Sequence, residues 1–267
     1  MLKDKFKIPV CIGNDGDLFV YGEAIAGLLP KVNDMLKKAG SPKRYKNLLG
    51  VTLGTGFGCG IVSDGKLLGG DNSAAAEVWL MRNKVNNKCI AEEGVSIRAI
   101  RNEYAKIAGI KPDESLSPKD IFEIAKGKKS GNKDAAQKAF CSMADVLADA
   151  LANANTLIDG LMVIGGGLSG AAGIFLPEVV KQMNGSIEKI SGEKLQRLVM
   201  KVYNLEDKKE LKQFCRGQVK EIKVPGSSKK MLYDPQKRTA IGLSILGTSK
   251  ATAIGAYAFA LDAIDSI

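Results

Sequence analysis

The sequence predicts an α/β fold, in which strands alternate with long helices along the chain. Residues 48–70 hold two apolar runs on either side of a glycine-rich turn, which indicates a β-hairpin. Residues 134–158 carry apolar side chains three or four positions apart, which predicts a long helix, and the apolar run 160–164 follows as a buried strand. This alternation is typical of the α/β class.

The N-terminal part is predicted to hold a strand over residues 5–12, a helix over 18–29 that Pro30 ends, and a polar segment, 31–47, with a short helix ending near Gly40. Asn14 and Asp15 follow the predicted strand, and Asn or Asp is a favoured residue at a helix N-terminus. The polar composition of residues 31–47 is typical of a linker or of a boundary between two lobes.

The rest of the chain continues this alternation. Helices are expected over residues 94–108, 176–183 and the alanine-rich 249–267. A further helix is expected after Ser117, with Pro118 at its first position. Within the hairpin region, Asp64 and Gly65 are a strong signal for a tight turn. Residues 203–240 are rich in lysine and show little periodicity, so they are predicted to form an excursion on the surface.

The composition excludes several kinds of chemistry. The 267 residues include no histidine, so a general base must be a carboxylate, a lysine or a tyrosine. The five cysteines are scattered without a Cys-x-x-Cys pair, which indicates reduced thiols, a cytoplasmic protein and no cysteine zinc site. The sequence shows neither the apolar run of a membrane span nor the apolar core of a signal peptide.

The net charge of +10 raises the question of an anionic partner. The lysines are spread over polar stretches and are not interleaved with aromatic residues on one segment. We interpret them first as solvated faces and second as a means of attracting anionic substrates such as nucleotides. Neither a nucleic acid nor a membrane is expected as a partner.

The glycine-rich turn over residues 54–60 is the first candidate site. At Gly54, Thr55 and Gly56, backbone N–H groups can approach a phosphate because glycine has no Cβ in the way. The turn is not a P-loop, since no Lys-Ser/Thr pair opens a helix, and Cys59 stands where the third glycine of a Rossmann fingerprint would be. A tight turn without a ligand is the alternative.

A second glycine cluster follows the predicted buried strand. Gly165, Gly167 and Gly170 formally match the G-x-G-x-x-G dinucleotide fingerprint, with Glu188 as the acidic residue further on, although no following strand is evident. A corner where glycines allow a helix and a strand to pack closely is one alternative. We interpret residues 165, 166 and 167 as one half of a nucleotide cleft, with the first glycine turn as the other half.

Carboxylates are the candidates for catalysis. Asp15, at the mouth of a helix, is placed to accept the proton of a hydroxyl group in phosphoryl transfer, and Asn14 can orient a polyol; an ordinary helix cap is the alternative. Glu77 lies among small apolar residues and needs hydroxyl groups or other donors if it is buried. For Glu92 the alternatives are a similar polar cluster and a favourable charge at a helix N-terminus. For Trp79 the alternatives are stacking on a sugar and a place in the core.

The order of these elements resembles the ROK family (repressors, open reading frames and sugar kinases). The resemblance covers residues 8–108, 160–177 and 247–260. It implies an actin-like (ribonuclease H-like), two-lobed sugar kinase fold with an incomplete smaller lobe. The implied division is residues 1–46 for the remnant of the smaller lobe, 47–247 for the larger lobe with the nucleotide and sugar cleft, and 248–267 for a helix that packs back toward the smaller lobe.

The resemblance also implies a function and its residues. The activity is ATP-dependent phosphorylation of a hexose, as in a glucokinase, with ATP and Mg²⁺ as cofactors. The implied roles are catalytic base for Asp15, sugar binding for Asn14, Glu77 and Glu92, binding of ATP phosphates for Gly54, Thr55 and Gly56, and contact near the adenosine for Gly165, Gly166 and Gly167.

This chain departs from the family pattern in two places. Leu80 stands in place of the zinc-motif histidine and only Cys89 remains of its cysteines, so no zinc is expected and the sugar pocket is reshaped. Nothing before Lys5 matches the family's phosphate-gripping Asp-x-Gly-Gly-Thr hairpin, so we expect a chain that lacks most of the smaller lobe. A non-catalytic sugar- or nucleotide-binding remnant or regulator is the alternative, and an NAD-dependent oxidoreductase a third. Homo-oligomerisation is left open.

Overall fold

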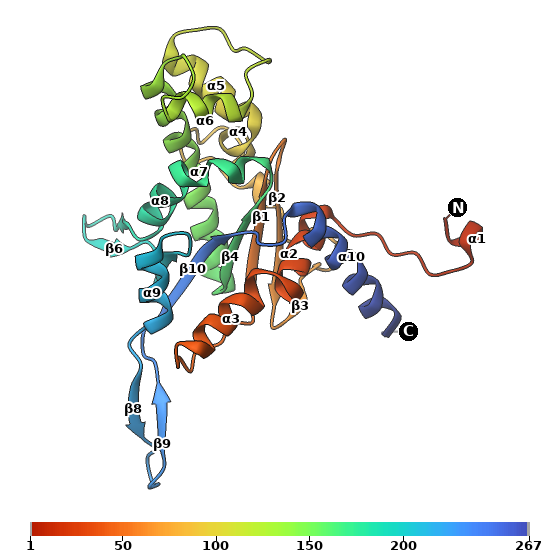
Figure 1. The fold of residues 1–267 in the computed structure, drawn as a ribbon, viewed down its shortest axis with the longest axis vertical. Coiled ribbons are helices and arrows are strands. Elements are labelled where there is room, and N and C mark those ends of the chain that lie inside the picture. Colours follow the sequence, from red (N-terminus) through yellow and green to blue (C-terminus); the bar gives the residue numbers. More distant parts are fainter. Residues whose placement is uncertain (1, 266–267) are drawn as a thin grey trace.

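A mixed sheet of six strands lies at the centre of the molecule (Figure 1). The computed structural model describes residues 2–265. The strand order is β3-β2-β1-β4-β10-β7, in which β1, β4, β10 and β7 are parallel, and β2 is antiparallel to β1 and to β3. The strands are β1 (Leu48–Leu53), β2 (Phe57–Ser63), β3 (Lys66–Leu67), β4 (Leu161–Gly165), β7 (Lys201–Asn204) and β10 (Arg238–Leu243).

Helices cover both faces of this sheet. The main ones are α7 (Lys133–Ile158) and α8 (Ala172–Met183) on one face, α2 (Asp15–Ala26) and α3 (Leu28–Lys38) on the other, and α10 (Thr248–Asp265), which packs on α2. Successive side chains of a strand point to opposite faces of the sheet. Val51 and Ile164 therefore join the core under α7 and α8, whereas Leu48 and Val163 join the core under α2 and α3.

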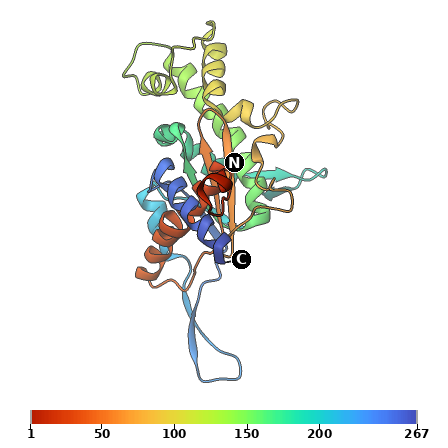
Figure 2. The same ribbon diagram turned by 90° about the vertical axis from the view of Figure 1, so that its right-hand side faces the viewer.

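The remaining elements extend the molecule at its two ends (Figures 1 and 2). The helices α4 (Glu92–Val95), α5 (Ile97–Ala108) and α6 (Pro118–Ala125) lie at one end, and the hairpin of β8 (Lys220–Lys223) and β9 (Lys230–Tyr233) at the other. The other elements are α1 (Leu2–Phe6), β5 (Ser186–Glu188), β6 (Lys194–Gln196), α9 (Lys208–Arg216) and the 3-10 helices η1 (Val78–Leu80) and η2 (Gly167–Ala171). Between residues 2 and 265, no helix combines the length and the apolar character that crossing a membrane requires.

The predicted α/β class is confirmed, and so are several of its elements. Asp64 and Gly65 connect β2 to β3 with φ values of 49° and 80°, as a tight hairpin turn requires. Ser117 begins a capping box at the start of α6. The predicted helix over 94–108 is divided into α4 and α5 at Ser96, whose side chain caps α5.

The predicted strand over residues 5–12 is wrong. The segment begins with the end of α1 and then has no regular structure. The side chains of Ile8, Val10 and Ile12 are 58%, 41% and 90% exposed. A strand needs a neighbour for its backbone hydrogen bonds, and in the described part of the chain no strand pairs with this segment.

The boundaries of the first large helix also differ from the prediction of 18–29. Helix α2 begins earlier, at the aspartate after Asn14, and Gly27 separates it from α3. Pro30 does not end a helix, because it lies in the first turn of α3, where its missing N–H group has no intrahelical partner to lose. Helix α3 buries Val32 and Leu36, so this part of the predicted linker belongs to the packed core.

The interpretation of residues 203–240 as a surface excursion is wrong for parts of the segment, although more than half of its residues are exposed. It contains α9, the end of β7 and the start of β10, and Phe214 and Ala240 are fully buried. Only the hairpin of β8 and β9 extends from the body (Figures 1 and 2). A central parallel strand is buried on both faces and shows no alternation, so the six residues of β10 next to lysine-rich stretches leave little periodic signal.

Candidate functional site

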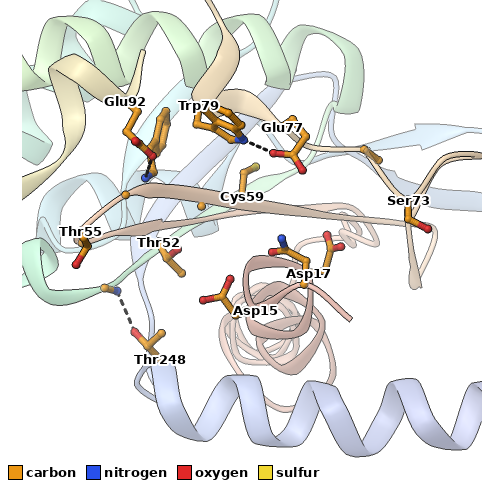
Figure 3. Close-up of a pocket in the computed structure, with 17 residues that line it drawn as sticks. Asp15, Asp17, Thr52, Thr55, Cys59, Ser73, Glu77, Trp79, Glu92 and Thr248 are labelled. Atoms are coloured by element: carbon orange, nitrogen blue, oxygen red, sulfur yellow. Dashed lines mark hydrogen bonds between the residues drawn. The ribbon is translucent and has the colours of Figure 1, made fainter. Parts of the chain in front are cut away.

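A pocket of about 570 Å³ opens at the carboxyl ends of β1 and β4, beside the start of α2 (Figure 3). This volume is within the usual range for sites that bind small molecules. The predicted residues that line it are Asn14, Asp15, Gly54, Thr55, Gly56, Glu77, Glu92 and Gly166. Segments far apart in the sequence therefore meet in one cavity.

The two glycine turns lie side by side because β1 and β4 are neighbouring parallel strands. A Cβ atom on Gly166 would overlap the backbone of Leu53, the last residue of β1. Gly166 also has a φ of 87°, in the left-handed region that favours glycine. Its N–H group donates a hydrogen bond of 2.9 Å to the hydroxyl oxygen of Thr248, at the start of α10.

The other two predicted glycines of the second turn do not line the pocket. A Cβ atom on Gly165 would lie 2.6 Å from the ring of Phe19, so this glycine allows α2 to pack against β4. Gly167 faces open space, with no heavy atom within 4 Å of its Cβ position. The alternative of a packing corner therefore describes Gly165, whereas Gly166 belongs to the pocket.

In the first turn and in the strand after it, glycine is required at different positions for different physical reasons. Gly54 faces open space, so its backbone can be approached from the pocket. Gly58 and Gly60 belong to β2, and a Cβ atom would lie 2.5 Å from the Thr52 hydroxyl at the first and 2.5 Å from a methyl group of Val20 at the second. Gly58 still lines the pocket with the turn, whereas Gly60 packs against α2 and does not line it.

Asn14 and Asp15 lie where the chain enters α2. The Asn14 side chain accepts a hydrogen bond of 2.8 Å from the N–H group of Gly16, so it does cap the helix, as the alternative interpretation expected. Asp15 is exposed to the pocket. In Figure 3 it lies between the end of the pocket with Thr55 and Thr248 and the end with Glu77. The helix cap at Asn14 and the exposed carboxylate of Asp15 are therefore neighbours at the start of α2.

Glu77 and Trp79 reach the pocket from the loop after β3. The indole N–H of Trp79 donates a hydrogen bond to the Glu77 carboxylate, which is exposed rather than buried. Trp79 is half-buried against the core and lines the pocket as well, so the core alternative is confirmed in part, and stacking on a sugar stays a prediction.

Glu92 lies against the glycine turn. Its Oε2 accepts a hydrogen bond of 3.0 Å from the N–H group of Phe57, the first residue of β2. The same oxygen would lie 2.8 Å from a Cβ atom on Gly56. One carboxylate oxygen thus holds the turn in place.

Four polar residues of the pocket were missed by the sequence analysis: Asp17, Thr52, Ser73 and Thr248. Asp17 lies in the first turn of α2, two positions after Asp15. This proximity to Asp15 is the sequence feature that could have identified it. Burial raises the pKa of Asp17 to about 6, with further increases from the charges of Glu77 and Asp15. No sequence feature marks Thr248 as a pocket residue, because only the fold brings the start of α10 to Gly166.

The dinucleotide fingerprint is incomplete in the structure. Glu188 belongs to β5, which pairs only with β6 in a separate two-stranded sheet, and its carboxylate faces Lys194 at 3.8 Å. In a Rossmann unit the acidic residue ends a strand next to the first one. Here the strands beside β4 are β1 and β10, so Glu188 cannot serve that purpose.

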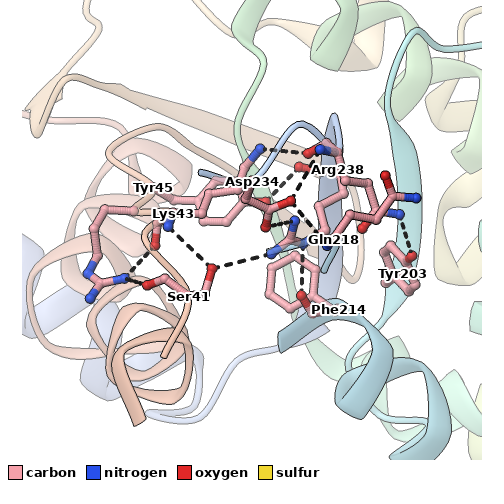
Figure 4. Close-up of polar contacts among 10 residues, drawn as sticks. Ser41, Lys43, Tyr45, Tyr203, Phe214, Gln218, Asp234 and Arg238 are labelled. Carbon is pink, nitrogen blue, oxygen red and sulfur yellow. Dashed lines mark hydrogen bonds and ion pairs between the residues drawn. The ribbon is translucent and has the colours of Figure 1, made fainter. Parts of the chain in front are cut away.

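A second polar cluster, at the base of the β8–β9 hairpin, is buried and internally paired (Figure 4). The guanidinium of Arg238 is 0% exposed, forms an ion pair with Asp234 and donates a hydrogen bond of 2.8 Å to the carbonyl oxygen of Phe214. The N–H groups of Gln218 and Gln236 each donate to the Asp234 carboxylate at 3.2 Å. The cluster therefore ties the hairpin to β10 and α9.

We expect Asp234→Ala to lower the free energy of unfolding by about 3 kcal/mol, because it leaves the buried Arg238 without its anionic partner. Urea unfolding at pH 7 measures this loss. Glu221→Ala is the control, since that residue pairs with Lys230 on the surface of the same hairpin and is expected to change stability by less than about 1 kcal/mol. Equal midpoints for the two variants would contradict the prediction.

The same ion pair predicts a pH dependence. Burial alone would raise the pKa of Asp234, but the hydrogen bonds from Arg238, Gln218 and Gln236 outweigh it and hold the pKa below the ordinary value of 3.8. The stabilisation is therefore fully present above pH 3.8 and is lost as the pH falls through the pKa of the folded state. The difference between wild type and Asp234→Ala should shrink in strong acid.

Comparison with known proteins identifies relatives of this chain. The sequence model described as "ROK family" matches residues 1–208. A glucokinase of Halalkalibacterium halodurans is 32% identical over 210 residues, which is 68% of this chain and 55% of the relative. An N-acetyl-D-glucosamine kinase of Vibrio cholerae is 30% identical over 186 residues, which is 63% of this chain and 55% of the relative. The chain thus spans about half the length of the curated relatives it matches.

Solved structures show the same relationship. The crystal structure of a glucokinase from Parabacteroides distasonis matches with a TM-score of 0.89 and 50% identity, over 98% of this chain and 71% of that one. A ROK family glucokinase from Streptomyces griseus, in complex with glucose and AMPPNP, matches with a TM-score of 0.56 and 19% identity, over 96% and 69% of the two chains. The second match shows likeness of fold alone. The actin-like fold that the sequence analysis expected is therefore confirmed.

Proposed function

Because the chain belongs to the ROK family, we propose that it phosphorylates a hexose with ATP, as a glucokinase-like sugar kinase. Its similarity to glucokinases and to an N-acetyl-D-glucosamine kinase supports this activity. The observation that carries the proposal is the order of groups along one pocket. Asp15 lies between the end with Thr55 and Thr248, next to the glycine turns, and the end with Glu77.

Asp15 would act as the general base. It would take the proton of a sugar hydroxyl as that oxygen attacks the terminal phosphorus of ATP and the bond to the ADP oxygen breaks. The products are a sugar phosphate, ADP and a proton on Asp15. Asn14 and Glu77 would hold neighbouring sugar hydroxyls, and Glu92 would do so with the oxygen that does not bind Phe57.

The glycine turns would hold the phosphates of ATP. The backbone at Gly54 is open to the pocket, and Thr55, Gly56 and Gly166 lie beside it, so amide groups can come close to an anion. Mg²⁺ bound with the nucleotide would supply charge neutralisation on the phosphates. Zinc is not part of the proposal, since Leu80 stands where the family's zinc motif has histidine.

We extend the proposal to the organisation of the protein. Residues 1–46 would be the remnant of a smaller lobe, 47–247 the larger lobe, and 248–267 a helix that packs back toward the smaller lobe. The five cysteines are unpaired, which favours the cytoplasm. The partners would be the hexose and ATP, with homo-oligomerisation a further possibility to measure by sedimentation.

A coupled ATP–hexose assay tests the function. We expect ADP release with at least one of glucose, N-acetylglucosamine and N-acetylgalactosamine, and none without sugar. Sugar binding is measured in parallel by isothermal titration calorimetry. Binding without turnover would favour the non-catalytic remnant or regulator, and the absence of both would refute the sugar-kinase proposal.

A further inference from the structure

Asp17 has a carboxylate oxygen that the protein does not satisfy. Between residues 2 and 265, its Oδ1 is one of two buried side-chain oxygen or nitrogen atoms that have no hydrogen-bond partner. A buried polar atom without a partner costs folding free energy. The atom belongs to a side chain that lines the pocket, so a bound molecule can supply the missing donor.

The charged groups nearest Asp17 are carboxylates, which supply neither a donor nor a positive charge. Asp15 lies on the same helix turn, and Glu77 faces it from the loop after β3. The buried thiol of Cys59, on β2, donates to the carbonyl oxygen of Gly60 and not to Asp17. Among the described residues that line the pocket, four are carboxylic acids and none is lysine or arginine. An ionised carboxylate only accepts hydrogen bonds, so the ligand at this end of the pocket must donate them.

We propose that Asp17 is a further substrate-binding residue, which accepts a hydrogen bond from one hydroxyl group of the sugar. The inference rests on the proposed function and adds a contact that the sequence analysis did not assign. Figure 3 places Asp17 at the same end of the pocket as Glu77 and away from Thr55 and Thr248. A polyol at this end is rich in donors, whereas a phosphate or another anion would meet like charge.

Trp79 makes the binding step measurable without turnover. It is the single tryptophan of the chain, it lines the pocket, and its indole binds Glu77. Titration of each sugar while tryptophan emission is recorded therefore reports occupancy of this pocket, and calorimetry provides a second measurement. The wild-type chain is titrated first, and the sugar that binds best is used below.

We expect Asp17→Asn to lower the affinity for that sugar by about tenfold or more, as the loss of a hydrogen bond to a charged group does. The KM for ATP should stay within about twofold of wild type. Asp34→Asn is the matched control, since Asp34 is an exposed residue of α3 outside the pocket. Its sugar affinity should equal that of wild type.

Monodeoxy analogues of the sugar locate the contact. The analogue that lacks the hydroxyl bound by Asp17 should bind wild type and Asp17→Asn equally well, whereas the other analogues should keep the tenfold difference. A double-mutant cycle of protein and ligand measures this coupling. A uniform loss for every analogue would assign the effect to a distorted pocket and overturn the proposal.

Stability separates this role from a structural one. The pKa of Asp17 is raised to about 6 by burial, with Glu77 and Asp15 adding to it, so the folded protein holds this proton more tightly than the unfolded chain. Ionisation of Asp17 therefore lowers stability as the pH rises through 4 to 6. Asp17→Asn should raise Tm by roughly 2 °C or more at pH 7.5, with little change at pH 4.

Sugar affinity and Tm together distinguish the possible results. Weaker sugar binding together with a higher Tm supports the proposal, because a residue kept for structure alone would lower Tm when replaced. Unchanged sugar affinity in Asp17→Asn, with wild type binding normally, overturns this inference and leaves the sugar-kinase proposal standing. A wild-type chain that binds none of the sugars refutes both.

Discussion

Asp15→Asn is expected to lower kcat for sugar phosphorylation by about a factor of 10³, while the affinity for the sugar stays within a few fold of wild type. General-base groups contribute factors of this size, and asparagine cannot accept the proton of the attacking hydroxyl. The change keeps the size of the side chain and leaves Asn14 to cap α2. A coupled assay gives kcat, and Trp79 fluorescence gives the sugar affinity.

The control is Asp134→Asn. Asp134 also lies in the first turn of a helix, α7, that an asparagine side chain caps, and it is exposed far from the pocket lining. Both variants remove a favourable charge at a helix N-terminus, worth up to about 1 kcal/mol, so both should show a similar small change in stability. Comparable kcat values for the two variants would show that Asp15 is only a helix-start residue.

Gly255→Ala is expected to lower the free energy of unfolding by about 3 kcal/mol or more. Helices α2 and α10 cross so closely that a Cβ atom on Gly255 would overlap the carbonyl oxygen of Leu18, and one on Gly22 would overlap that of Ala251. Backbone atoms in two packed helices cannot move aside as a flexible side chain can, so the helices must separate. Urea unfolding measures the loss.

This substitution should also impair the pocket, because Thr248 begins α10 and binds the N–H group of Gly166. Gly173→Ala is the control: Gly173 lies in α8 with open space at its Cβ position, and alanine there should change stability by no more than about 1 kcal/mol. If Gly255→Ala unfolds at the same urea concentration as Gly173→Ala, the described crossing of α2 and α10 is incorrect.

The local parts of the site could be predicted from the sequence because their chemistry is local. The cap at Asn14 and the turn around Gly54 each depend on neighbours within a few positions, and both line the pocket. The strand over residues 5–12 was mispredicted for the opposite reason. An apolar alternation predicts a strand only where another strand is present to pair with it, and pairing partners lie elsewhere in the chain.

Residues 203–240 show the opposite error, in which the sequence analysis missed a strand that pairs with distant parts of the chain. β10 lies between β4 and β7 in the sheet, and its parallel partners lie far from it in the sequence. Its burial comes from the neighbouring strands and from both cores, with Ala240 in the core under α2 and α3 and Ile241 in the core under α7 and α8. None of these neighbours can be read from the few residues of β10 itself. The lysine-rich composition of the segment therefore led to the prediction of a surface excursion, and the buried strand β10 was missed.

The sequence by itself determined the α/β class, the two glycine turns and the exclusion of histidine as general base, which leaves a carboxylate, a lysine or a tyrosine. The tertiary structure decided that β1 and β4 are neighbours, that Thr248 meets Gly166, and that Asp17 is half-buried beside Glu77. Turns and caps follow from short-range sterics and hydrogen bonds. The juxtaposition of distant segments follows from burial of apolar surface, which is non-directional and depends on the whole chain.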